Sequence, residues 1–277
     1  RLLKKMEIER YIYIGAEGRQ SLYEWSANVQ HQELIVFVHG FMGFMDWGAW
    51  PLVQNFFTKK GYDFCRFNLS HNGGTPTDPI DFPDTAAFGK NTYSKETFDI
   101  SSLLDHLETQ HRTYQKIHLI GHSRGGGMAI LAAQQWKQKS PLGQVCTWAG
   151  ICDIERRFAQ GQDLKKWEKS GVRYVKNSRT LQDLPQFFEL YANFERNRHI
   201  LDIKAAAKDI AKHLHIFHGD QDASVPISEA YELQEVSGVK VIEIHGADHV
   251  FGASHPWNKP TLPPLLEELC QQTLKCL

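Results

Sequence analysis

Short apolar runs alternate with longer amphipathic segments over most of the 277-residue chain. The run at 34–38 is almost continuously apolar, as expected of a strand that is buried on both faces of a sheet. Further strand-like runs are predicted at residues 63–69, 116–120, 145–149, 214–218 and 239–245. Helical patterns separate these runs. The order predicts an α/β fold with a mostly parallel, eight-stranded type of sheet and helices on both faces.

The first part of the chain carries a different pattern. Residues 8–14 and 21–26 are predicted to form an antiparallel pair of strands that precedes the parallel sheet. Helices are predicted at residues 49–60, from Ser94 to Arg112 with Ser94 as the N-cap, and at 262–274.

Residues 151–212 interrupt the alternation and are too long for one crossover helix. They start at the carboxyl end of a predicted strand, so we interpret them as a helical cap inserted into a single domain of residues 1–277. The cap carries thirteen Lys or Arg against nine Asp or Glu, which fits either an anionic substrate or a solvated helical face. Its aromatic side chains either line a pocket or pack the cap onto the body: Phe158, Trp167, Tyr174, Phe187, Phe188, Tyr191 and Phe194. The long loop at 70–93 is predicted to be a lid element or a mobile segment.

Composition narrows the class of protein. Hydrophobic residues make up 42% and charged residues 23%, which is ordinary for a globular enzyme, and the net charge of −1 gives no electrostatic reason to bind nucleic acid or an anionic membrane. The chain lacks an apolar run of membrane-spanning length and a signal-peptide pattern, so a cytoplasmic protein without membrane insertion is expected, with Met6 as its native start. The five cysteines show no metal-ligand spacing and predict neither a disulfide framework nor a zinc site; Cys65 and Cys146 are expected to be buried thiols.

Gly-His-Ser-Arg-Gly at residues 121–125 lies between a predicted strand and a predicted helix. A sharp strand-to-helix turn over the pattern G-x-S-x-G exposes its serine at the edge of the sheet. Any side chain on the two outer glycines would collide with the adjoining strand or helix. This context predicts Ser123 as a catalytic nucleophile, with Gly121 and Gly125 required by the turn.

A serine hydroxyl is a poor nucleophile at neutral pH, so it needs a base and an acid that orients the base. Two aspartates follow the predicted strand at 214–218, in a loop closed by Pro226. We prefer Asp222 as the acid. Asp220 is the alternative, but it lies next to the strand, where it can shape the turn.

The base is predicted in the loop after the strand at 239–245. His249 follows Gly246 and is free to reach the nucleophile, so it is the preferred base. His245 is the alternative, although at the end of the strand it can equally be a packed, hydrogen-bonded side chain.

The loop after the buried strand at 34–38 reads His39-Gly40-Phe41. Gly40 lets the backbone approach a substrate oxygen closely. The amide N–H groups of Phe41 and Arg124 are therefore predicted to form an oxyanion hole, with His39 bracing the loop.

Taken together, these motifs resemble those of the α/β-hydrolase-fold serine hydrolases, from about residue 20 to the C-terminus. Within that fold, the chain is most similar to small carboxylesterases of the feruloyl (cinnamoyl) esterase type and to single-domain relatives of acyl-peptidases. Ser123 stands where dehalogenases and epoxide hydrolases carry a carboxylate nucleophile. The stretch 66–75 departs from an Asp-x-x-Gly-x-Gly-x-Ser-like pattern found in many relatives.

The predicted reaction is hydrolysis of a small-molecule ester with a small or aryl acyl group, through a triad of Ser123, His249 and Asp222. It requires no cofactor and no metal. Hydrolysis of an amide or a thioester is the alternative, since the triad serves all three. A non-catalytic ligand-binding member of the fold is the third possibility.

Overall fold

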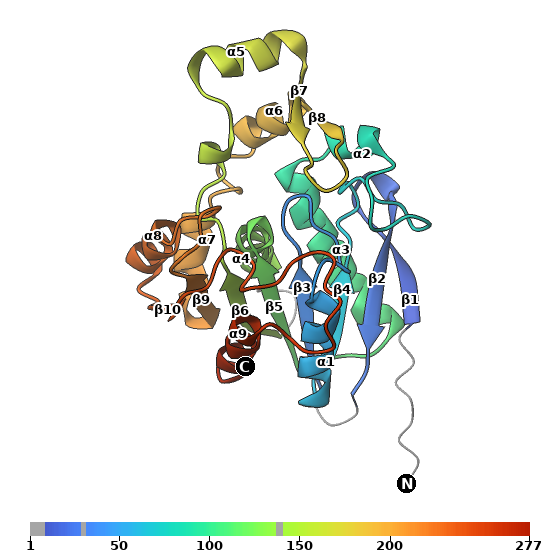
Figure 1. The fold of residues 1–277 in the computed structure, drawn as a ribbon, viewed down its shortest axis with the longest axis vertical. Coiled ribbons are helices and arrows are strands. Elements are labelled where there is room, and N and C mark those ends of the chain that lie inside the picture. The colour runs from blue at the N-terminus through green and yellow to red at the C-terminus, as the bar shows by residue number, and fades with distance from the viewer. Residues whose placement is uncertain (1–8, 29–31, 137–140) are drawn as a thin grey trace.

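The computed structural model describes residues 9–28, 32–136 and 141–277. Met6, the expected start, lies outside them. An eight-stranded sheet runs through the molecule in the order β1-β2-β4-β3-β5-β6-β9-β10 (Figure 1). Its strands are β1 (Glu9–Ile14), β2 (Gln20–Ser26), β3 (Glu33–Val38), β4 (Asp63–Phe67), β5 (Lys116–His122), β6 (Leu142–Trp148), β9 (Leu214–Gly219) and β10 (Val241–Ile244). β2 is antiparallel to both β1 and β4, and all other neighbours are parallel. The predicted fold class is confirmed.

Helices cover both faces of this sheet. One face packs against α1 (Trp50–Lys59) and α9 (Pro264–Leu274), and the other against α3 (Tyr93–Gln110), α4 (Arg124–Trp136), α7 (Ile203–Asp209) and α8 (Ser228–Ser237). Side chains of β3 alternate between the two faces of the sheet. Val36 packs in the core under α3, α4, α7 and α8, and Phe37 packs in the core under α1 and α9. This explains the continuous apolar run, because both faces of β3 are buried. The N-cap of α3 is Thr92, whose side chain accepts from the amide of Lys95, and not Ser94 as predicted.

The cap contains a β-hairpin and is therefore not purely helical as predicted. Between α5 (Gly161–Ser170) and α6 (Glu189–Arg196), β7 (Val172–Lys176) and β8 (Asp183–Phe187) pair as antiparallel strands. Val172, Tyr174 and Val175 make β7 rich in β-branched and aromatic residues, which suits a strand and outweighs the helical interpretation. These elements stand beyond the carboxyl ends of the parallel strands (Figure 1), whereas α7 returns to pack on α4 and α8. Short 3-10 helices lie at Ala16–Gly18, Glu155–Arg157 and Ala211–His213.

The segment 70–93 supports the cap. It contains α2 (Thr85–Gly89), which packs against β8 of the hairpin. Phe82 and Phe88 form a small buried cluster with Leu184. The loop therefore joins the cap to the body through an apolar contact.

The remaining structural expectations concern thiols and membrane segments. All five cysteines are free, and Cys65 and Cys146 are buried. In the described part of the chain, no helix is long and apolar enough to cross a membrane.

Candidate active site

Ser123 occupies the turn between β5 and α4 with φ of 58°, in the left-handed region that a serine rarely adopts. Its amide donates to the carbonyl of Trp148 at the end of β6 (2.9 Å), and its own carbonyl accepts from Gly126 and Ile151. These bonds from two directions hold the strained residue in place at the carboxyl edge of the sheet.

The two outer glycines of the turn are sterically required. A Cβ on Gly121 would lie 2.2 Å from the carbonyl oxygen of Gly125, inside the start of α4. A Cβ on Gly125 would lie 2.3 Å from the carbonyl oxygen of Val38 and 2.4 Å from that of His39, at the end of β3. All three distances are far below any contact that a carbon atom tolerates, which is the steric reason expected from the sequence.

Ser123, His249 and Asp222 form one hydrogen-bonded chain. Ser123 Oγ lies 3.0 Å from His249 Nε2, and His249 Nδ1 lies 2.8 Å from Asp222 Oδ2. Because a carboxylate can only accept, Nδ1 carries the proton of the neutral ring, and Nε2 is left free to accept from the serine hydroxyl. The three side chains come from loops after β5, β9 and β10, which explains how residues up to 126 positions apart meet.

The carboxyl group of Asp222 is held in its ionised form. Oδ1 accepts from the amides of Ser224 (2.8 Å) and Val225 (2.9 Å), and Oδ2 lies 3.3 Å from Nε2 of the fully buried His218. Burial by itself would raise the pKa of Asp222. Hydrogen bonds from His218 and His249 more than offset this and hold its pKa well below the usual range. The acid thus keeps its charge at neutral pH.

The alternative pair, Asp220 and His245, lies elsewhere. Asp220 accepts from the amide of Gly246 (2.7 Å) and pairs with His245 (3.2 Å), and the side chain of His245 is 81% exposed. This pair ties the loop after β9 to the loop after β10. It makes no hydrogen bond to Ser123.

The loop after β3 lies directly against Ser123. A Cβ on Gly40 would lie 3.0 Å from the Cβ of Ser123. Within the described residues, the amide N–H groups of Phe41 and Arg124 have no hydrogen-bond partner. His39 braces the loop: it accepts from the amide of Leu69 (3.1 Å) and donates from Nδ1 to Gly40 O (2.8 Å). Burial lowers the pKa of His39 to about 4, consistent with this neutral role.

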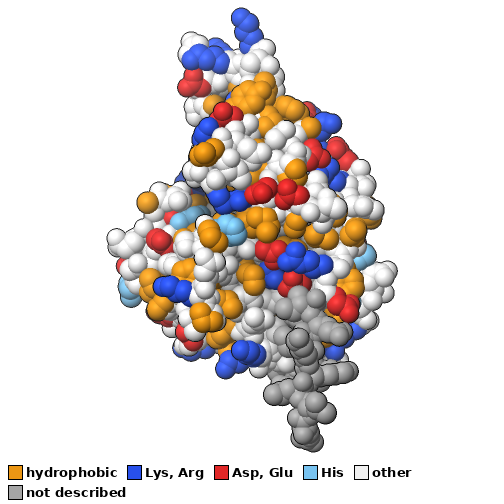
Figure 2. Space-filling view, turned by 45° about the vertical axis from the view of Figure 1, so that its right-hand side comes forward, with side chains coloured by type: hydrophobic (Ala, Val, Ile, Leu, Met, Phe, Trp, Pro, Cys, Tyr) orange, Lys and Arg blue, Asp and Glu red, His pale blue; other side chains and the backbone are white. Residues whose placement is uncertain are grey.

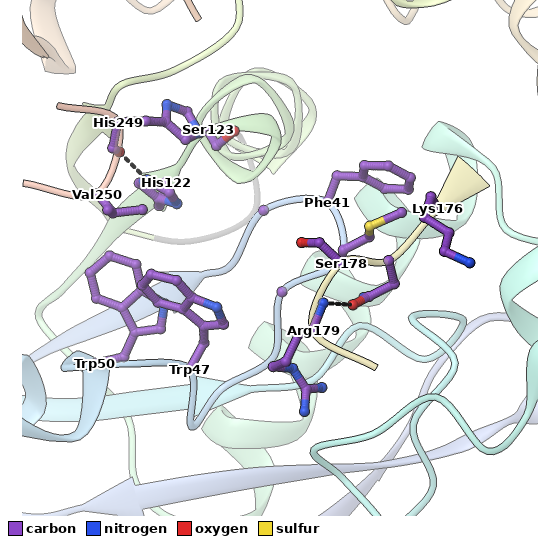
Figure 3. A pocket seen from close by; sticks show the side chains of 14 residues that line it. Phe41, Trp47, Trp50, His122, Ser123, Lys176, Ser178, Arg179, His249 and Val250 are labelled. Atoms are coloured by element: carbon purple, nitrogen blue, oxygen red, sulfur yellow. Dashed lines mark hydrogen bonds between the residues drawn. The ribbon is translucent and has the colours of Figure 1, made fainter. Parts of the chain in front are cut away.

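His122 also belongs to the site, and the sequence interpretation missed it. Its Nε2 donates to the backbone carbonyl of His249 (2.8 Å), and its ring packs on Trp50 (Figure 3). Burial and then the neighbouring His249 lower the pKa of His122 to about 3, so the ring is neutral. The sequence could have indicated this role, because His122 lies between Gly121 and Ser123 in the turn.

Two cavities meet at Ser123. The first, of about 270 Å³, lies between Trp47 and Trp50 on the body and residues 176–179 of the cap (Figure 3). The second, of about 380 Å³, extends from the same serine toward α3 and the hairpin. Phe41, Ser123 and His249 line both, so a bound molecule can place one group on each side of the nucleophile.

None of the seven cap aromatics lines these two cavities. Phe158, Trp167, Phe188 and Tyr191 pack on one another in T-shaped or tilted pairs, and Tyr174 is exposed. The aromatic walls come from the body instead. Of the two interpretations open from the sequence, packing therefore applies to these four side chains, and neither applies to Tyr174. In the described residues, no group of three or more His, Cys, Asp or Glu side chains is arranged to hold a metal ion.

Residues 35–258 match the model of the alpha/beta hydrolase family. The chain belongs to this family. Among curated proteins, it is similar to YtmA from Bacillus subtilis (strain 168), described as an uncharacterized peptidase, with 25% identity over 131 residues. That match covers 47% of this chain and 44% of YtmA, so it spans less than half of that relative.

Solved structures that cover nearly the whole chain have a similar fold. Est1E from Butyrivibrio proteoclasticus with ferulic acid bound has a TM-score of 0.69 and 18% identity, covering 96% of this chain and 98% of that one. Alpha/beta hydrolase domain-containing protein 10 from mouse has a TM-score of 0.65 and 18% identity, covering 96% and 97%. At these identities the likeness concerns the fold alone.

Proposed function

We propose that the protein hydrolyses carboxylic esters through an acyl-enzyme formed on Ser123. The observation that carries this proposal is the unbroken chain from Asp222 Oδ2 to His249 to Ser123 Oγ, with distances of 2.8 Å and 3.0 Å. Hydrogen bonds in this order allow the histidine to take the proton of the serine hydroxyl as its oxygen attacks a carbonyl carbon.

In the first half of the reaction, Ser123 Oγ bonds to the ester carbonyl carbon while its proton passes to His249 Nε2. The carbonyl oxygen becomes an oxyanion, and the amide N–H groups of Phe41 and Arg124 donate to it. As the tetrahedral intermediate collapses, the bond to the alcohol oxygen breaks and His249 returns the proton to that oxygen. Asp222 stabilises the imidazolium throughout and stays ionised.

In the second half, a water molecule repeats these steps. It gives a proton to His249 Nε2 and bonds to the acyl carbon, and the bond to Ser123 Oγ then breaks. His249 returns the proton to Oγ, which releases the carboxylic acid and restores the enzyme.

The substrate class follows from the cavities. Volumes of about 270 Å³ and 380 Å³ suit small or single-ring groups on either side of the scissile bond. Trp47 and Trp50 offer flat apolar walls to an aryl group. The ferulic acid bound to Est1E, an aromatic acid on a similar fold, supports the same class.

Turnover of p-nitrophenyl acetate and butyrate tests the proposal, together with labelling by a fluorophosphonate probe, which reacts with an activated serine. Ser123→Ala is expected to lose both with its thermal midpoint unchanged, while Ser102→Ala on α3, remote from the site, keeps both. Wild-type turnover in Ser123→Ala, or an unlabelled wild-type protein, would refute the assignment.

Amide cleavage is the second candidate, because YtmA is described as a peptidase. The same triad can cleave an amide if His249 protonates the amine as it leaves. An acylated amino-acid p-nitroanilide separates the two: higher kcat/KM on the anilide than on the matching ester would make amide cleavage the main activity.

A further inference from the structure

The cavity of about 380 Å³ is unusual in its charge. Three guanidinium groups line it, those of Arg124, Arg157 and Arg173, and none of its lining residues in the described chain is Asp or Glu. Figure 2 shows Lys and Arg side chains beside histidines at the level where the cap meets the body. The same cavity contains Ser123 and His249, so whatever fills it touches the nucleophile.

Two of the three arginines have a carboxylate partner outside the cavity. Arg124 pairs with Glu96 (3.3 Å), and its guanidinium lies between the rings of Phe41 and Tyr93. Arg157 pairs with Glu229 of α8. Glu96 and Glu229 thus balance two of the three positive charges.

Part of Arg157 nevertheless remains unsatisfied. Its Nε is buried and has no hydrogen-bond partner among the described residues. A buried donor without an acceptor is costly.

Arg173, on β7 of the cap hairpin, has no carboxylate partner of this kind among the described residues. Within the described residues, its guanidinium makes one hydrogen bond, from Nε to Gln186 Oε1 (2.9 Å), and no carboxylate lies within ion-pairing distance. It stacks on Trp167 at 4.0 Å, which fixes the plane of the group. Its two terminal nitrogens retain donors in the fork geometry that matches a carboxylate.

Tyr93 lines the same cavity. Burial raises the pKa of Tyr93; the charge of Arg124 lowers it, that of Glu96 raises it, and those of Arg157 and Arg173 lower it. Unpaired positive charge in a half-enclosed cavity attracts an anion more strongly than the same charge on an open surface.

The other cavity at Ser123 differs in this respect. Its two cations, Arg179 and Lys176, pair with Asp81 (2.8 Å) and Asp183 (3.4 Å) at the surface. Both positive charges there already have a partner. The unbalanced charge is therefore specific to the cavity that contains Arg173.

We propose that the cavity lined by Arg124, Arg157 and Arg173 binds a carboxylate carried by the ester substrate, with Arg173 as the residue that determines this specificity. The inference rests on the proposed ester hydrolysis and adds the substrate class: an ester in which the acyl group or the alcohol bears a negative charge. The cap contributes this recognition through its hairpin, whereas the body contributes the chemistry.

The experiment compares esters matched in size but differing in charge. For the acyl side, mono-p-nitrophenyl glutarate is compared with p-nitrophenyl valerate; for the alcohol side, 4-acetoxybenzoate with 4-acetoxybenzamide. The readout is the ratio of kcat/KM for the anionic to the neutral ester, each corrected for its rate without enzyme, which for the glutarate includes attack by its own carboxylate. We expect a ratio of about ten or more in one of the two arms, which also assigns the side of the scissile bond.

Variants separate recognition from packing. Arg173→Met, which keeps the stem on Trp167, is expected to lower this ratio about tenfold, and Arg173→Lys to restore part of it, because lysine retains charge without the fork. Arg196→Met on α6, paired with Glu189 outside both cavities, is the matched control and leaves the ratio unchanged. Salt at about 0.5 M is expected to reduce the wild-type ratio.

A wild-type ratio within about twofold of unity in both arms, or an unchanged ratio in Arg173→Met, would overturn the inference while ester hydrolysis stands. Failure of the proposed function looks different: neither neutral ester is turned over and the fluorophosphonate probe does not label Ser123.

Discussion

His122 Nε2 donates a hydrogen bond to the backbone carbonyl of His249 (2.8 Å), so the residue before Ser123 holds the main chain of His249. The rings of the two histidines also pack at 4.9 Å between centroids. The loop after β10 is thereby fixed to the turn after β5 at the point where Ser123 and His249 must meet. Rigid support of this kind keeps a catalytic hydrogen bond short without further reorganisation.

Replacing His122 tests this support. His122→Phe keeps the packing on Trp50 but removes the donor, and we expect kcat to fall by roughly tenfold to a hundredfold while KM changes little. His122→Gln, which can still donate, is expected to recover part of kcat. Equal losses in both variants, in proportion to a lower thermal midpoint, would indicate that the residue serves stability only.

Substitutions of the two histidines after β10 are expected to have different effects on kcat. His249→Gln removes the base and is expected to lower kcat by about 10³-fold or more, with the fold retained. His245→Gln removes an exposed side chain bonded to Asp220, so kcat is expected to stay within about twofold of wild type. Steady-state kinetics on p-nitrophenyl butyrate measure both. The reverse order would assign the base to His245.

The triad could be predicted from the sequence because each member follows an apolar strand, and parallel strands bring their carboxyl ends to one edge. Ser123 had in addition a turn whose glycines leave few alternatives. The preferences for Asp222 over Asp220 and His249 over His245 rested on distance from the strand end alone. The geometry brings the preferred pair to the serine.

The cap could not be predicted in the same way. Its hairpin depends on α2 and Phe82 of a distant loop, which supply the surface on which β8 packs. Its aromatics pack on one another, and the cavity walls are Trp47 and Trp50 of the body, whose position depends on how α1 meets the sheet. Arg173 is singled out by having no carboxylate partner among the described residues, and a missing ion pair can be seen only in the folded chain.

Replacing Gly125 and Gly238 by alanine compares a steric clash, at Gly125, with an unfavourable backbone conformation alone, at Gly238. Gly125→Ala forces a Cβ to within 2.3 Å of the Val38 carbonyl, so we expect loss of soluble folded protein or a destabilisation of about 3 kcal/mol or more. Gly238, after α8, has φ of +76° with nothing near its missing Cβ. Gly238→Ala is therefore expected to cost only about 1–2 kcal/mol, measured by urea denaturation. Similar losses at both positions would contradict the steric argument.

Acid is expected to destabilise the folded protein between about pH 6.5 and pH 4. Burial lowers the pKa of His39 and His71 to about 4 and is the main cause that lowers the pKa of His122 to about 3, so the unfolded chain takes up these protons at higher pH than the folded one. Asp99 opposes them: burial raises its pKa to about 6, and the folded state binds that proton first.

Taken by themselves, these three histidines and Asp99 leave the unfolded chain with about two more protons near pH 5, which contributes a fall of about 2.7 kcal/mol per pH unit to the free energy of unfolding. Burial also lowers the pKa of five further histidines, which act in the same direction: His106, His111, His118, His215 and His255. Urea denaturation at several pH values from roughly 7 to 4.5 measures this slope. Asp99→Asn removes the opposing group and should steepen it. A flat profile over this range, or an unchanged slope in Asp99→Asn, would show that these groups do not govern acid stability.

Acyl-chain preference tests the size of the site. The cavity between Trp47 and Trp50 and the cap holds about 270 Å³, at the low end of ligand pockets, and the cap interleaves its aromatics with charged residues instead of presenting a broad apolar surface. On p-nitrophenyl esters of about two to sixteen carbons, we expect kcat/KM to be highest for short chains and to fall beyond about ten carbons. Methyl ferulate is expected to be a substrate because an aryl group can lie on Trp47, and Trp47→Ala should lower kcat/KM for methyl ferulate more than for the acetate ester. A maximum at the longest chains, or a rise in rate once micelles form, would identify instead a lipid-hydrolysing enzyme whose cap opens at interfaces.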